Sequence, residues 1–565
     1  MRATRAKQPS FRFNSSNLAS VKTTRDLVEQ RIRFAAQGAL GADPDVVEIA
    51  RPQQAEHGDF STNLAMKLAR ELKRRPSDIA TDLVKQLSGT SDGLITRAEV
   101  AGPGFVNVWL NPHHVEQQVD AIRAAGLNYG RSQTQQPKRI DVEFVSANPT
   151  GPLTVGNARG AFVGDLLCRV LEAVGHEVTR EYYFNDSGGQ VERLGLSVWA
   201  LANNQAVPED GYHGEYVADM AKEVPPDVRQ QAEADASKSG WVVGGWASER
   251  IRKGIERSLE NLGTHFDVWT TEGSNHDAGW VERGIEQLKQ TGYMYEQDGA
   301  LWFKSTQFGD DKDRVVIRSN GEPTYFASDI GYVVEKFSRG FDELIYIWGA
   351  DHHGTVARLK NAAQALGLDR DAVNVLLIAW VRFVRNGEEV SMSKRSGEFV
   401  TLDELLAEVG VDAARWFFAS RAPSTGIDFD IELARKQSSE NPVYYVQYAH
   451  ARISSILRRA TDSGLSPSAT LETGLADDDI SLALGKELLR LPDIVRDAAD
   501  VRETQAITTF ATDLATRFHA FYRDRRVVDA ADPVTSGHRL ALVDATRVTL
   551  AAALGLLGIS APDSM

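Results

Sequence analysis

The 565-residue chain is long enough to bury the cores of roughly three or four domains. Its 78 acidic and 63 basic residues give a formal net charge of −15, which excludes a uniformly basic nucleic-acid binder and leaves only local basic patches for RNA. The single cysteine, Cys168, excludes a disulfide framework and a cysteine-rich zinc site, and without an apolar run of about 18 residues we expect no membrane span.

The N-terminal segment is basic, with six lysines and arginines before the first acid, Asp26. It is either a transit peptide or a flexible extension. Because it forms no clear amphipathic helix or cleavage pattern, we expect a flexible extension over 1–24. The next part, 25–132, mixes helical stretches with strands and closes on AEVAGPGFVNVWL, which predicts a small α+β domain.

Strands alternate with helices from 133 to 425, and this alternation predicts a mostly parallel sheet with crossover helices. The pattern lapses over about 190–314, which we interpret as an insertion into that domain. From 426 to 565 the pattern is almost entirely helical. The expected fold is therefore a Rossmann-like parallel-sheet α/β domain with an insertion, flanked by an N-terminal α+β domain and a C-terminal all-helical domain.

The first chemical motif is the block 140–169, in which a half-buried strand runs through the turn NPTGP into a helix. Gly156 and Gly160 flank the expected helix N-terminus, where unpaired N–H groups and the positive end of the helix dipole favour phosphate. An ordinary α/β crossover has the same outline. This block alone therefore leaves a nucleotide site and a plain crossover both open.

The second motif is VSMSKRSGEFVTLDEL, late in the same domain. Its small, cationic loop from Ser391 to Gly397 suits closure over phosphates and neutralisation of charge on a leaving pyrophosphate. Taken alone it also suits a solvated surface loop. Two such motifs on one α/β sheet make a nucleotide site much more specific.

With these motifs, the chain resembles the class I arginyl-tRNA synthetases from about Leu27 to Met565. In that family the first motif is the His-x-Gly-His signature and the second the Lys-Met-Ser-Lys signature, and both hold ATP around its phosphates. Here Thr154 and Asn157 replace the histidines, and Ser391 replaces the first lysine. Threonine and asparagine are also hydrogen-bond donors, and Arg395 can offset the lost lysine, so the changes bear on the rate and not on the family.

The resemblance implies ATP as a substrate, with Mg²⁺, and catalytic roles for four residues: Lys394, Arg395, Thr154 and Asn157. The ATP-binding positions that it implies are Pro152, Thr154, Gly156, Asn157, Gly349, Asp351, His352, Met392, Ser393 and Lys394.

The resemblance also implies an L-arginine site made of Glu143, Ser146, Asn148, Tyr325, Asp329 and His353. Glu143 and Asp329 would pair with the guanidinium, which needs carboxylates of fixed geometry. Tyr325 would pack against the stem of the substrate, and Asn148 with Ser146 would hold its amino group or carboxylate. The four-residue spacing puts Tyr325 and Asp329 on one helix face, if a helix begins there. The alternative is a first-turn helix acid beside a core tyrosine.

Asp351, His352 and His353 follow the strand IYIW and are three adjacent potential metal ligands. Neighbouring residues at a strand end point in different directions, and no second ligand cluster is present, so we expect no metal site. The carboxyl end of a parallel strand is instead where substrates bind. His353 is expected to contact the amino acid.

The outer domains carry the expected tRNA contacts. HGDFSTNLAM and AGPGFVNV resemble the extra domain of arginyl enzymes, which touches the outer corner of the tRNA. In the C-terminal domain, aromatics interleaved with arginines suit unstacked bases, although at least one tyrosine fits a helix core equally well. The expected tRNA-binding residues are Tyr444, Tyr448, Arg452 and Arg459.

The implied function is activation of L-arginine with ATP and its transfer to tRNA(Arg), by a cytoplasmic monomer with no membrane contact. Two alternatives remain. A catalytically weakened paralogue that binds tRNA or regulates is favoured by Thr154, Asn157 and Ser391 and disfavoured by the arginine pocket. A different adenylate-forming enzyme on the same sheet would leave the C-terminal helices unexplained.

Overall fold

The computed structural model describes residues 22–89, 93–186, 188–389, 400–471 and 474–565. The chain forms two compact units. One comprises Met1–His114, Arg131–Pro137 and Ala173–Gly175, and the other comprises Val115–Gly130, Lys138–Glu172 and His176–Met565. Of the expected extension 1–24, all but the last three residues lie outside the described part.

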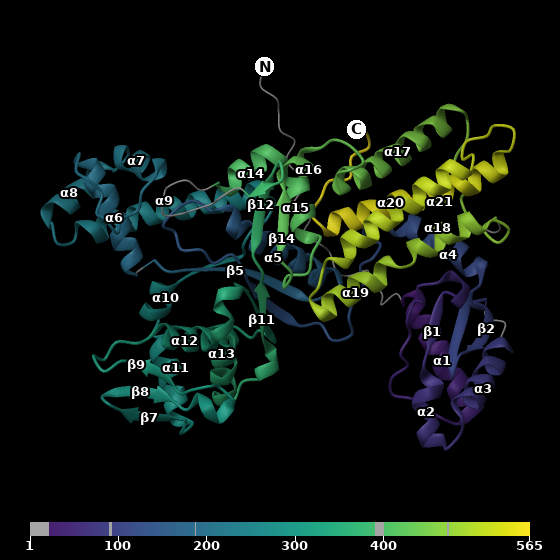
Figure 1. The fold of residues 1–565 in the computed structure, drawn as a ribbon, viewed down its shortest axis with the longest axis horizontal. Helices are drawn as coiled ribbons and strands as arrows, with labels where there is room; N and C mark the ends of the chain where they lie inside the picture. Colours follow the sequence, from purple (N-terminus) through teal and green to yellow (C-terminus); the bar gives the residue numbers. More distant parts are fainter. Residues whose placement is uncertain (1–21, 90–92, 187, 390–399, 472–473) are drawn as a thin grey trace. The chain divides into compact units, whose positions relative to one another are not determined.

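The N-terminal unit is an antiparallel sheet with helices, as an α+β domain requires (Figure 1). The sheet order is β1-β3-β2, with β1 at Phe60–Thr62, β2 at Ile95–Ala101 and β3 at Phe105–Leu110. The helices are α1 (Thr24–Leu40), η2 (Ala55–His57), α2 (Leu64–Leu72) and α3 (Pro76–Ser88). Most of α4 (Pro112–Ala125), which follows the sheet in the chain, belongs to the second unit. Apolar residues at helical spacing, such as Ile79, Leu83 and Leu87 of α3, are buried and form the core of this unit.

The second unit is built on a five-stranded sheet of order β11-β10-β4-β5-β6, in which every neighbouring pair is parallel. The strands are β4 (Arg139–Glu143), β5 (Glu177–Phe184), β6 (Val268–Thr271), β10 (Glu343–Gly349) and β11 (Val373–Ile378). Crossover helices include α5 (Val155–Ala173), α12 (Tyr325–Ser338) and α13 (His353–Ala365), with η3 (Gly126–Asn128), η5 (Ala350–His352) and η6 (Arg370–Ala372) as short turns. The expected parallel-sheet domain is confirmed.

The structure corrects one detail of β4. The alternation in IDVEF predicts a half-buried strand, but Asp141 and Glu143 are as buried as Ile140 and Val142. β4 is the central strand of the sheet, and both of its faces are covered. The acidic face is buried because a cation from α12 meets it, which a strand pattern cannot reveal.

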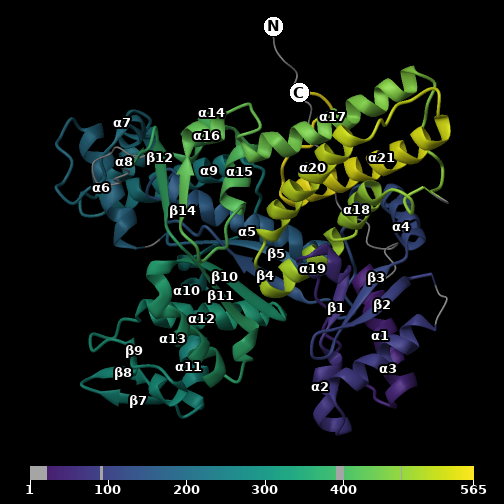
Figure 2. The same ribbon diagram turned by 45° about the vertical axis from the view of Figure 1, so that its right-hand side comes forward.

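The segment expected as one insertion is interrupted by a strand of the main sheet. Four helices come first: α6 (Gly189–Ala202), α7 (Glu215–Lys222), α8 (Pro226–Ala234) and α9 (Ser239–Asn261). Then β6 joins the edge of the parallel sheet beside β5. After it come α10 (Glu272–Asp277), α11 (Trp280–Gln290), β7 (Met294–Gln297), β8 (Ala300–Phe303), η4 (Ser305–Phe308) and β9 (Arg314–Ile317). The strands β7–β9 form an antiparallel sheet that lies with α11, α12 and α13 (Figure 2).

The chain then passes through a small sheet of order β13-β12-β14, from β12 (Val381–Arg385), β13 (Glu388–Glu389) and β14 (Ile427–Asp430). Three helices accompany this sheet: α14 (Leu402–Val409), α15 (Val411–Ala419) and α16 (Ile431–Arg435). The C-terminal part is helical as expected, with α17 (Pro442–Asp462), α18 (Asp479–Leu488), α19 (Leu491–Val501), α20 (Ala506–Asp524) and α21 (Pro533–Leu556). None of the described helices combines the length and the apolar character that a membrane crossing requires.

Candidate active site

The turn after β4 has an unusual backbone. Val145 and Ser146 both have positive φ, 69° and 40°, and the Ser146 N–H donates to the Phe144 carbonyl at 3.0 Å. A positive φ at a β-branched residue is strained, and such strain persists only where the surroundings enforce it. Here β5 does so: the Tyr182 hydroxyl accepts from the Ala147 N–H at 3.0 Å and donates to its carbonyl at 2.8 Å. The turn that carries Ser146 and Asn148 is therefore rigidly held.

The two altered signature positions bind each other at the start of α5. The N–H and the hydroxyl of Thr154 donate to Asn157 Oδ1 at 3.2 and 3.0 Å, and the Asn157 N–H donates to the Thr154 carbonyl at 2.9 Å. The bond from the Thr154 N–H to the Asn157 side chain is one of the two bonds of a capping box; the Asn157 N–H goes to the Thr154 carbonyl and not to its hydroxyl. Because the Thr154 hydroxyl proton is used here, the side-chain donor that this pair can offer a phosphate is the Asn157 amide NH₂.

Glycines bring α5 close to β4 and leave its first turn open. A Cβ at Gly164 would lie 2.3 Å from the Phe144 ring, so only glycine permits the approach of helix and strand. A Cβ at Gly156, by contrast, would meet only the Thr154 hydroxyl, at 3.4 Å. The positive end of α5 is thus accessible at Gly156, as phosphate binding requires.

Backbone hydrogen bonds join the second motif to the first. Ser391, Met392, Ser393, Lys394 and Arg395 lie outside the described residues, but both flanks of this stretch are described. On the C-terminal side, Val155 N–H donates to Val400 carbonyl at 3.2 Å, and Leu402 N–H donates to Leu153 carbonyl at 2.8 Å. The chain therefore leaves the second motif directly beside Thr154.

The expected guanidinium contacts, Glu143 and Asp329, lie in a cluster of acidic side chains, and we call the part of it at Glu143, Asp329 and Glu272 the acidic pocket of the expected arginine site. Burial raises the pKa of Asp329 to about 7; Arg358 opposes this shift, and Glu143 and Glu272 add to it. Burial also raises the pKa of Tyr183, and the acids that add to this shift are Glu272, Asp329, Glu143 and Asp186. These carboxylates therefore share one neighbourhood, which favours a cation.

Glu272 was not predicted from the sequence, although it is buried in this pocket. The Ser328 hydroxyl donates to its Oε1 at 3.3 Å, and burial raises its pKa. It comes directly after the carboxyl end of β6, the strand that the sequence analysis missed. Had β6 been recognised, the rule that ligands bind at the carboxyl ends of parallel strands would have pointed to Glu272.

Two other expected arginine contacts, Tyr325 and Asn148, differ in how accessible their side chains are to a substrate. Tyr325 is the first residue of α12, so a helix does begin there, and its side chain is 69% exposed, which rules out the core alternative. Asn148 is held at both ends: its Nδ2 donates to Gln190 Oε1 at 2.9 Å, and its Oδ1 accepts from the Asn185 N–H at 3.1 Å. Tyr325 is thus available to a substrate, while Asn148 would have to exchange a partner.

The segment after β10 is open to solvent. Gly349 ends β10, Asp351 and His352 lie in η5, and His353 is the first residue of α13; all four are exposed. His352 Nε2 lies 3.6 Å from Asp351 Oδ2. Within the described ranges, no group of three or more His, Cys, Asp or Glu side chains could hold a metal ion. Glu143 pairs with Tyr346 in the parallel sheet, so the carboxyl ends of β4 and β10 lie side by side. The segment after β10 therefore lies at the same end of the sheet as the acidic pocket.

Three of the four expected tRNA contacts cluster on α17. The rings of Tyr444 and Tyr448 are stacked with centroids 6.5 Å apart, and the Arg452 guanidinium lies 6.0 Å from the Tyr448 ring. Two residues of α20, which the sequence did not single out for this cluster, join it: His519 lies 6.1 Å from Tyr448, and Tyr522 lies 4.7 Å from Arg452. The fourth, Arg459, is exposed further along α17.

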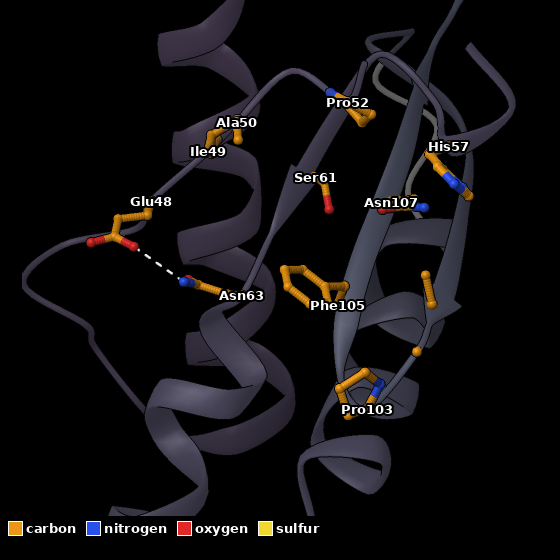
Figure 3. A pocket seen from close by; sticks show the side chains of 12 residues that line it. Glu48, Ile49, Ala50, Pro52, His57, Ser61, Asn63, Pro103, Phe105 and Asn107 are labelled. Atoms are coloured by element: carbon orange, nitrogen blue, oxygen red, sulfur yellow. Dashed lines mark hydrogen bonds between the residues drawn. The ribbon is translucent and has the colours of Figure 1, made fainter. Parts of the chain in front are cut away.

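The two N-terminal motifs meet at a cavity of ≈ 470 Å³, shown in Figure 3. HGDFSTNLAM contributes His57, Ser61 and Asn63, and AGPGFVNV contributes Phe105 and Asn107. The Phe105 side chain is 39% exposed, and Asn63 donates to Glu48 at 3.2 Å on one wall. A half-exposed aromatic among amide groups suits a flat polar ligand such as a nucleobase.

Comparison with known proteins gives matches along nearly the whole chain. Three family models match: "Arginyl tRNA synthetase N terminal domain" over 24–110, "tRNA synthetases class I (R), catalytic domain" over 118–223 and 233–422, and "DALR anticodon binding domain" over 446–565.

Curated relatives and solved structures agree with these models. The arginine–tRNA ligase of Moorella thermoacetica is 48% identical over 540 residues, 94% of this chain and 96% of that one. The Bacillus subtilis arginine–tRNA ligase is 42% identical over 552 residues, 96% of this chain and 99% of that one. The Thermus thermophilus arginyl-tRNA synthetase structure, at 24% identity, has a TM-score of 0.77 over 96% of this chain and 100% of that chain and supports the fold.

Proposed function

The chain belongs to the class I arginyl-tRNA synthetases, and from this premise we propose how its residues activate L-arginine with ATP and transfer it to the 3′ end of tRNA(Arg). Its reaction is that of an arginine–tRNA ligase. The observation that carries the residue assignment is the acidic pocket of Glu143, Asp329 and Glu272. These acids lie at the carboxyl end of the parallel strands. From there β4 continues through the rigid turn at Val145 and Ser146 to the start of α5, which is open at Gly156.

In the arginine site, Glu143 and Asp329 pair with the guanidinium, which is planar and always charged. Tyr325, exposed one helical turn before Asp329, packs along the aliphatic stem. Ser146 and Asn148 hold the amino group or carboxylate, and His353 contacts the amino acid from the start of α13. The buried carboxylates make a charged substrate strongly preferable to a neutral analogue.

In the ATP site, the phosphates lie at the N-terminus of α5, over Gly156, with Pro152, Thr154 and Asn157 around them. The open space above Gly156 fits this role. From the carboxyl end of β10 and the η5 turn after it, Gly349, Asp351 and His352 reach the nucleotide. Met392, Ser393 and Lys394 complete the site, and the backbone bonds at Leu153 and Val155 return their segment to α5.

The first step forms arginyl-adenylate. The arginine carboxylate attacks the α-phosphorus of ATP, the bond to the β-phosphate oxygen breaks, and pyrophosphate leaves. Lys394 and Arg395 neutralise the charge that develops on pyrophosphate, and Mg²⁺, when bound to ATP, supplies further positive charge. In the second step the terminal ribose hydroxyl of tRNA attacks the carbonyl of the adenylate and releases AMP. Positioning and electrostatics suffice, so no protein nucleophile is required.

The outer parts hold the tRNA. The cavity of the N-terminal unit, with Phe105 and Asn107, receives an unstacked base of the outer corner (Figure 3). Tyr444, Tyr448 and Arg452 offer stacking surfaces to anticodon bases, with Arg459 on a phosphate.

This division of work corresponds to domains at 25–132, 133–425 and 426–565. We also propose that the protein acts as a monomer in the cytoplasm, which light scattering on the purified protein and microscopy of a tagged copy test. The support for both is the family resemblance.

The test is transfer of labelled arginine to tRNA(Arg) by the purified protein with ATP and Mg²⁺, with lysine and citrulline in parallel. Arginine-dependent charging is expected. The weakened-paralogue alternative predicts measurable tRNA binding without charging. In that case Thr154, Asn157 and Ser391 would be the first residues to revert to the family pattern.

A further inference from the structure

A fully buried lysine contacts Glu143 of the proposed arginine site. Lys336 of α12 has no solvent exposure, and its ammonium donates to Asp141 Oδ2 at 2.6 Å and to Glu143 Oε2 at 2.8 Å. Its other neighbours are Glu181 Oε2 at 4.0 Å and the ring centroids of Tyr332 and Tyr346, each at 4.5 Å. An unpaired ammonium cannot be kept in such a place, so these acids hold it charged.

The register of the sheet explains why the acids converge. Asp141 and Glu143 are two residues apart on β4 and so point to the same face, the one that Lys336 reaches. Glu181 on β5 and Tyr346 on β10 are the parallel partners of Glu143 and share that face. Glu143 is therefore the member of this group that adjoins both Lys336 and the pocket.

The helix α12 connects the two places. Tyr325, Asp329, Tyr332 and Lys336 follow one another at spacings of four, three and four residues, which puts them on one face of the helix. The first two are placed at the substrate. The last two contact the buried acids: the Tyr332 hydroxyl donates to Glu181 Oε1 at 2.5 Å, and Lys336 donates to Glu143.

The two oxygens of Glu143 are in different situations. Oε2 accepts from the Lys336 ammonium, and Oε1 accepts from the Ser146 hydroxyl at 3.2 Å. Lys336 and Ser146 together fix the rotation of the Glu143 carboxylate. Burial raises the pKa of Glu143, and the charge of Lys336 opposes that rise, so the same lysine favours the ionised form.

We propose that Lys336 is a positioning residue for arginine recognition: its buried ammonium orients Glu143 and keeps it ionised for the substrate guanidinium, without itself touching the substrate. This inference rests on the proposed role of Glu143. It makes the specificity for arginine depend on a residue that lies on the far side of the carboxylate from the ligand.

A second cation in the same network provides the contrast. Arg339 donates to Glu181 Oε2 at 2.6 Å and lies 3.1 Å from Glu335, and neither of these acids is placed in the arginine site. It follows α12 directly and is partly exposed. A merely structural role for the network would make Lys336 and Arg339 equivalent in their effect on substrate binding.

The experiment measures KM for arginine, KM for ATP and kcat in tRNA charging for Lys336→Met, Glu143→Gln, the double variant and Arg339→Met as the matched control. Lys336→Met is expected to raise KM for arginine by roughly 10- to 100-fold, the range for hydrogen bonds to charged groups, with KM for ATP within about twofold. Glu143→Gln raises KM for arginine similarly. The double variant is expected to be no worse than Glu143→Gln alone, because Lys336 acts through Glu143.

Different results refute different statements. If Glu143→Gln leaves KM for arginine unchanged, the proposed role of Glu143 fails. If Glu143→Gln raises it while Lys336→Met behaves like Arg339→Met, or if the effects of Lys336→Met and Glu143→Gln simply add, the positioning role of Lys336 fails and the role of Glu143 stands.

Removal of one buried charge can prevent folding, so a paired variant keeps the test available. Asp141→Leu with Lys336→Met replaces the shortest ion pair by two apolar side chains, a change that buried ion pairs often tolerate. It leaves Glu143 without its cation and is expected to raise KM for arginine as Lys336→Met does. An unchanged KM in this folded variant would overturn the proposal.

A pH profile adds a readout that packing alone would not move. The titratable and charged groups near Glu143 and Lys336 are Asp141, Glu181, Asp329, Glu335, Tyr183, Tyr332, Tyr346 and Arg339. Without the ammonium, ionisation of Glu143 requires higher pH. KM for arginine in Lys336→Met should therefore level off only at a higher pH than the wild-type KM does. Parallel profiles for the two proteins would contradict the inference.

Discussion

Replacement of Asp329 by asparagine should stabilise the folded protein but weaken its binding of arginine. Burial raises its pKa from 3.8 to about 7, a shift of roughly three units. At about 1.4 kcal/mol per unit, ionising this carboxyl in the folded protein costs up to about 4 kcal/mol. Asp329 keeps some exposure, so this figure is an upper bound. Binding of the arginine guanidinium offsets this cost, because the cation stabilises the ionised form of Asp329.

The sign follows from proton linkage. The folded pKa lies above the unfolded one, so the folded state binds more protons between about pH 4 and about pH 7. Asp329 therefore lowers the stability of the empty protein progressively across that window and fully above it. Asp329→Asn removes this loss: the variant should melt higher than wild type at about pH 8 and nearly equally at about pH 4.

Substrate binding runs the other way. Arginine binds the ionised form of Asp329, so its affinity for wild type should rise by up to tenfold per pH unit below about pH 7 and level off above it. Asp329→Asn should lose roughly 100-fold or more in kcat/KM for arginine. Thermal melts at the two pH values and KM for arginine over the window provide the assay. An arginine KM that is flat with pH, together with a variant no more stable than wild type at about pH 8, would refute the reasoning.

Three further results are expected. Thr154→His with Asn157→His should raise kcat, because it restores stronger hydrogen-bond donors to ATP, and charging rates measure this. The same change should lower the free energy of unfolding by about 1 kcal/mol in chemical denaturation, because it removes the bonds between Thr154 and Asn157 at the start of α5. An unchanged kcat would mean that the site has repacked. Gly164→Ala should cost about 1–3 kcal/mol, because its Cβ would lie 2.3 Å from a ring; a variant that melts like wild type would count against the close packing of α5 on β4. Tyr448→Ala should raise KM for tRNA about tenfold with KM for ATP unchanged, as loss of one stacked base predicts, and steady-state charging decides this.

Much of the fold was predictable because the periodicity of apolar residues indicates helices and strands. The alternation of strands and helices predicted the parallel sheet, and the uniform helical pattern predicted the C-terminal part. The four-residue spacing put Tyr325 and Asp329 on one helix face on the condition that a helix begins there, and α12 does begin at Tyr325. These features depend on local sequence, which a single chain displays directly.

The features that were missed depend on what packs against them. β6 is a four-residue edge strand with no fully buried side chain, so its pattern is too weak to distinguish it from the surrounding insertion. The acidic face of β4 looked like a solvated face, because the compensating Lys336 comes from a helix almost 200 residues later in the chain. Its ammonium lies 2.6 Å from Asp141 Oδ2. Glu272 was overlooked for the same reason as β6. Sequence patterns cannot assign a residue whose role depends on a partner far away in the chain.

The most direct test of the account is the ratio of kcat/KM for arginine to that for citrulline in charging of tRNA(Arg). Citrulline has nearly the shape of arginine but no charge, so the ratio isolates the buried carboxylates from the fit of the stem. A pocket built on Glu143 and Asp329 predicts a ratio on the order of 10⁴ or more, because the neutral analogue leaves buried charges unpaired. A ratio below about 10² would show that shape alone selects the substrate and would contradict the account.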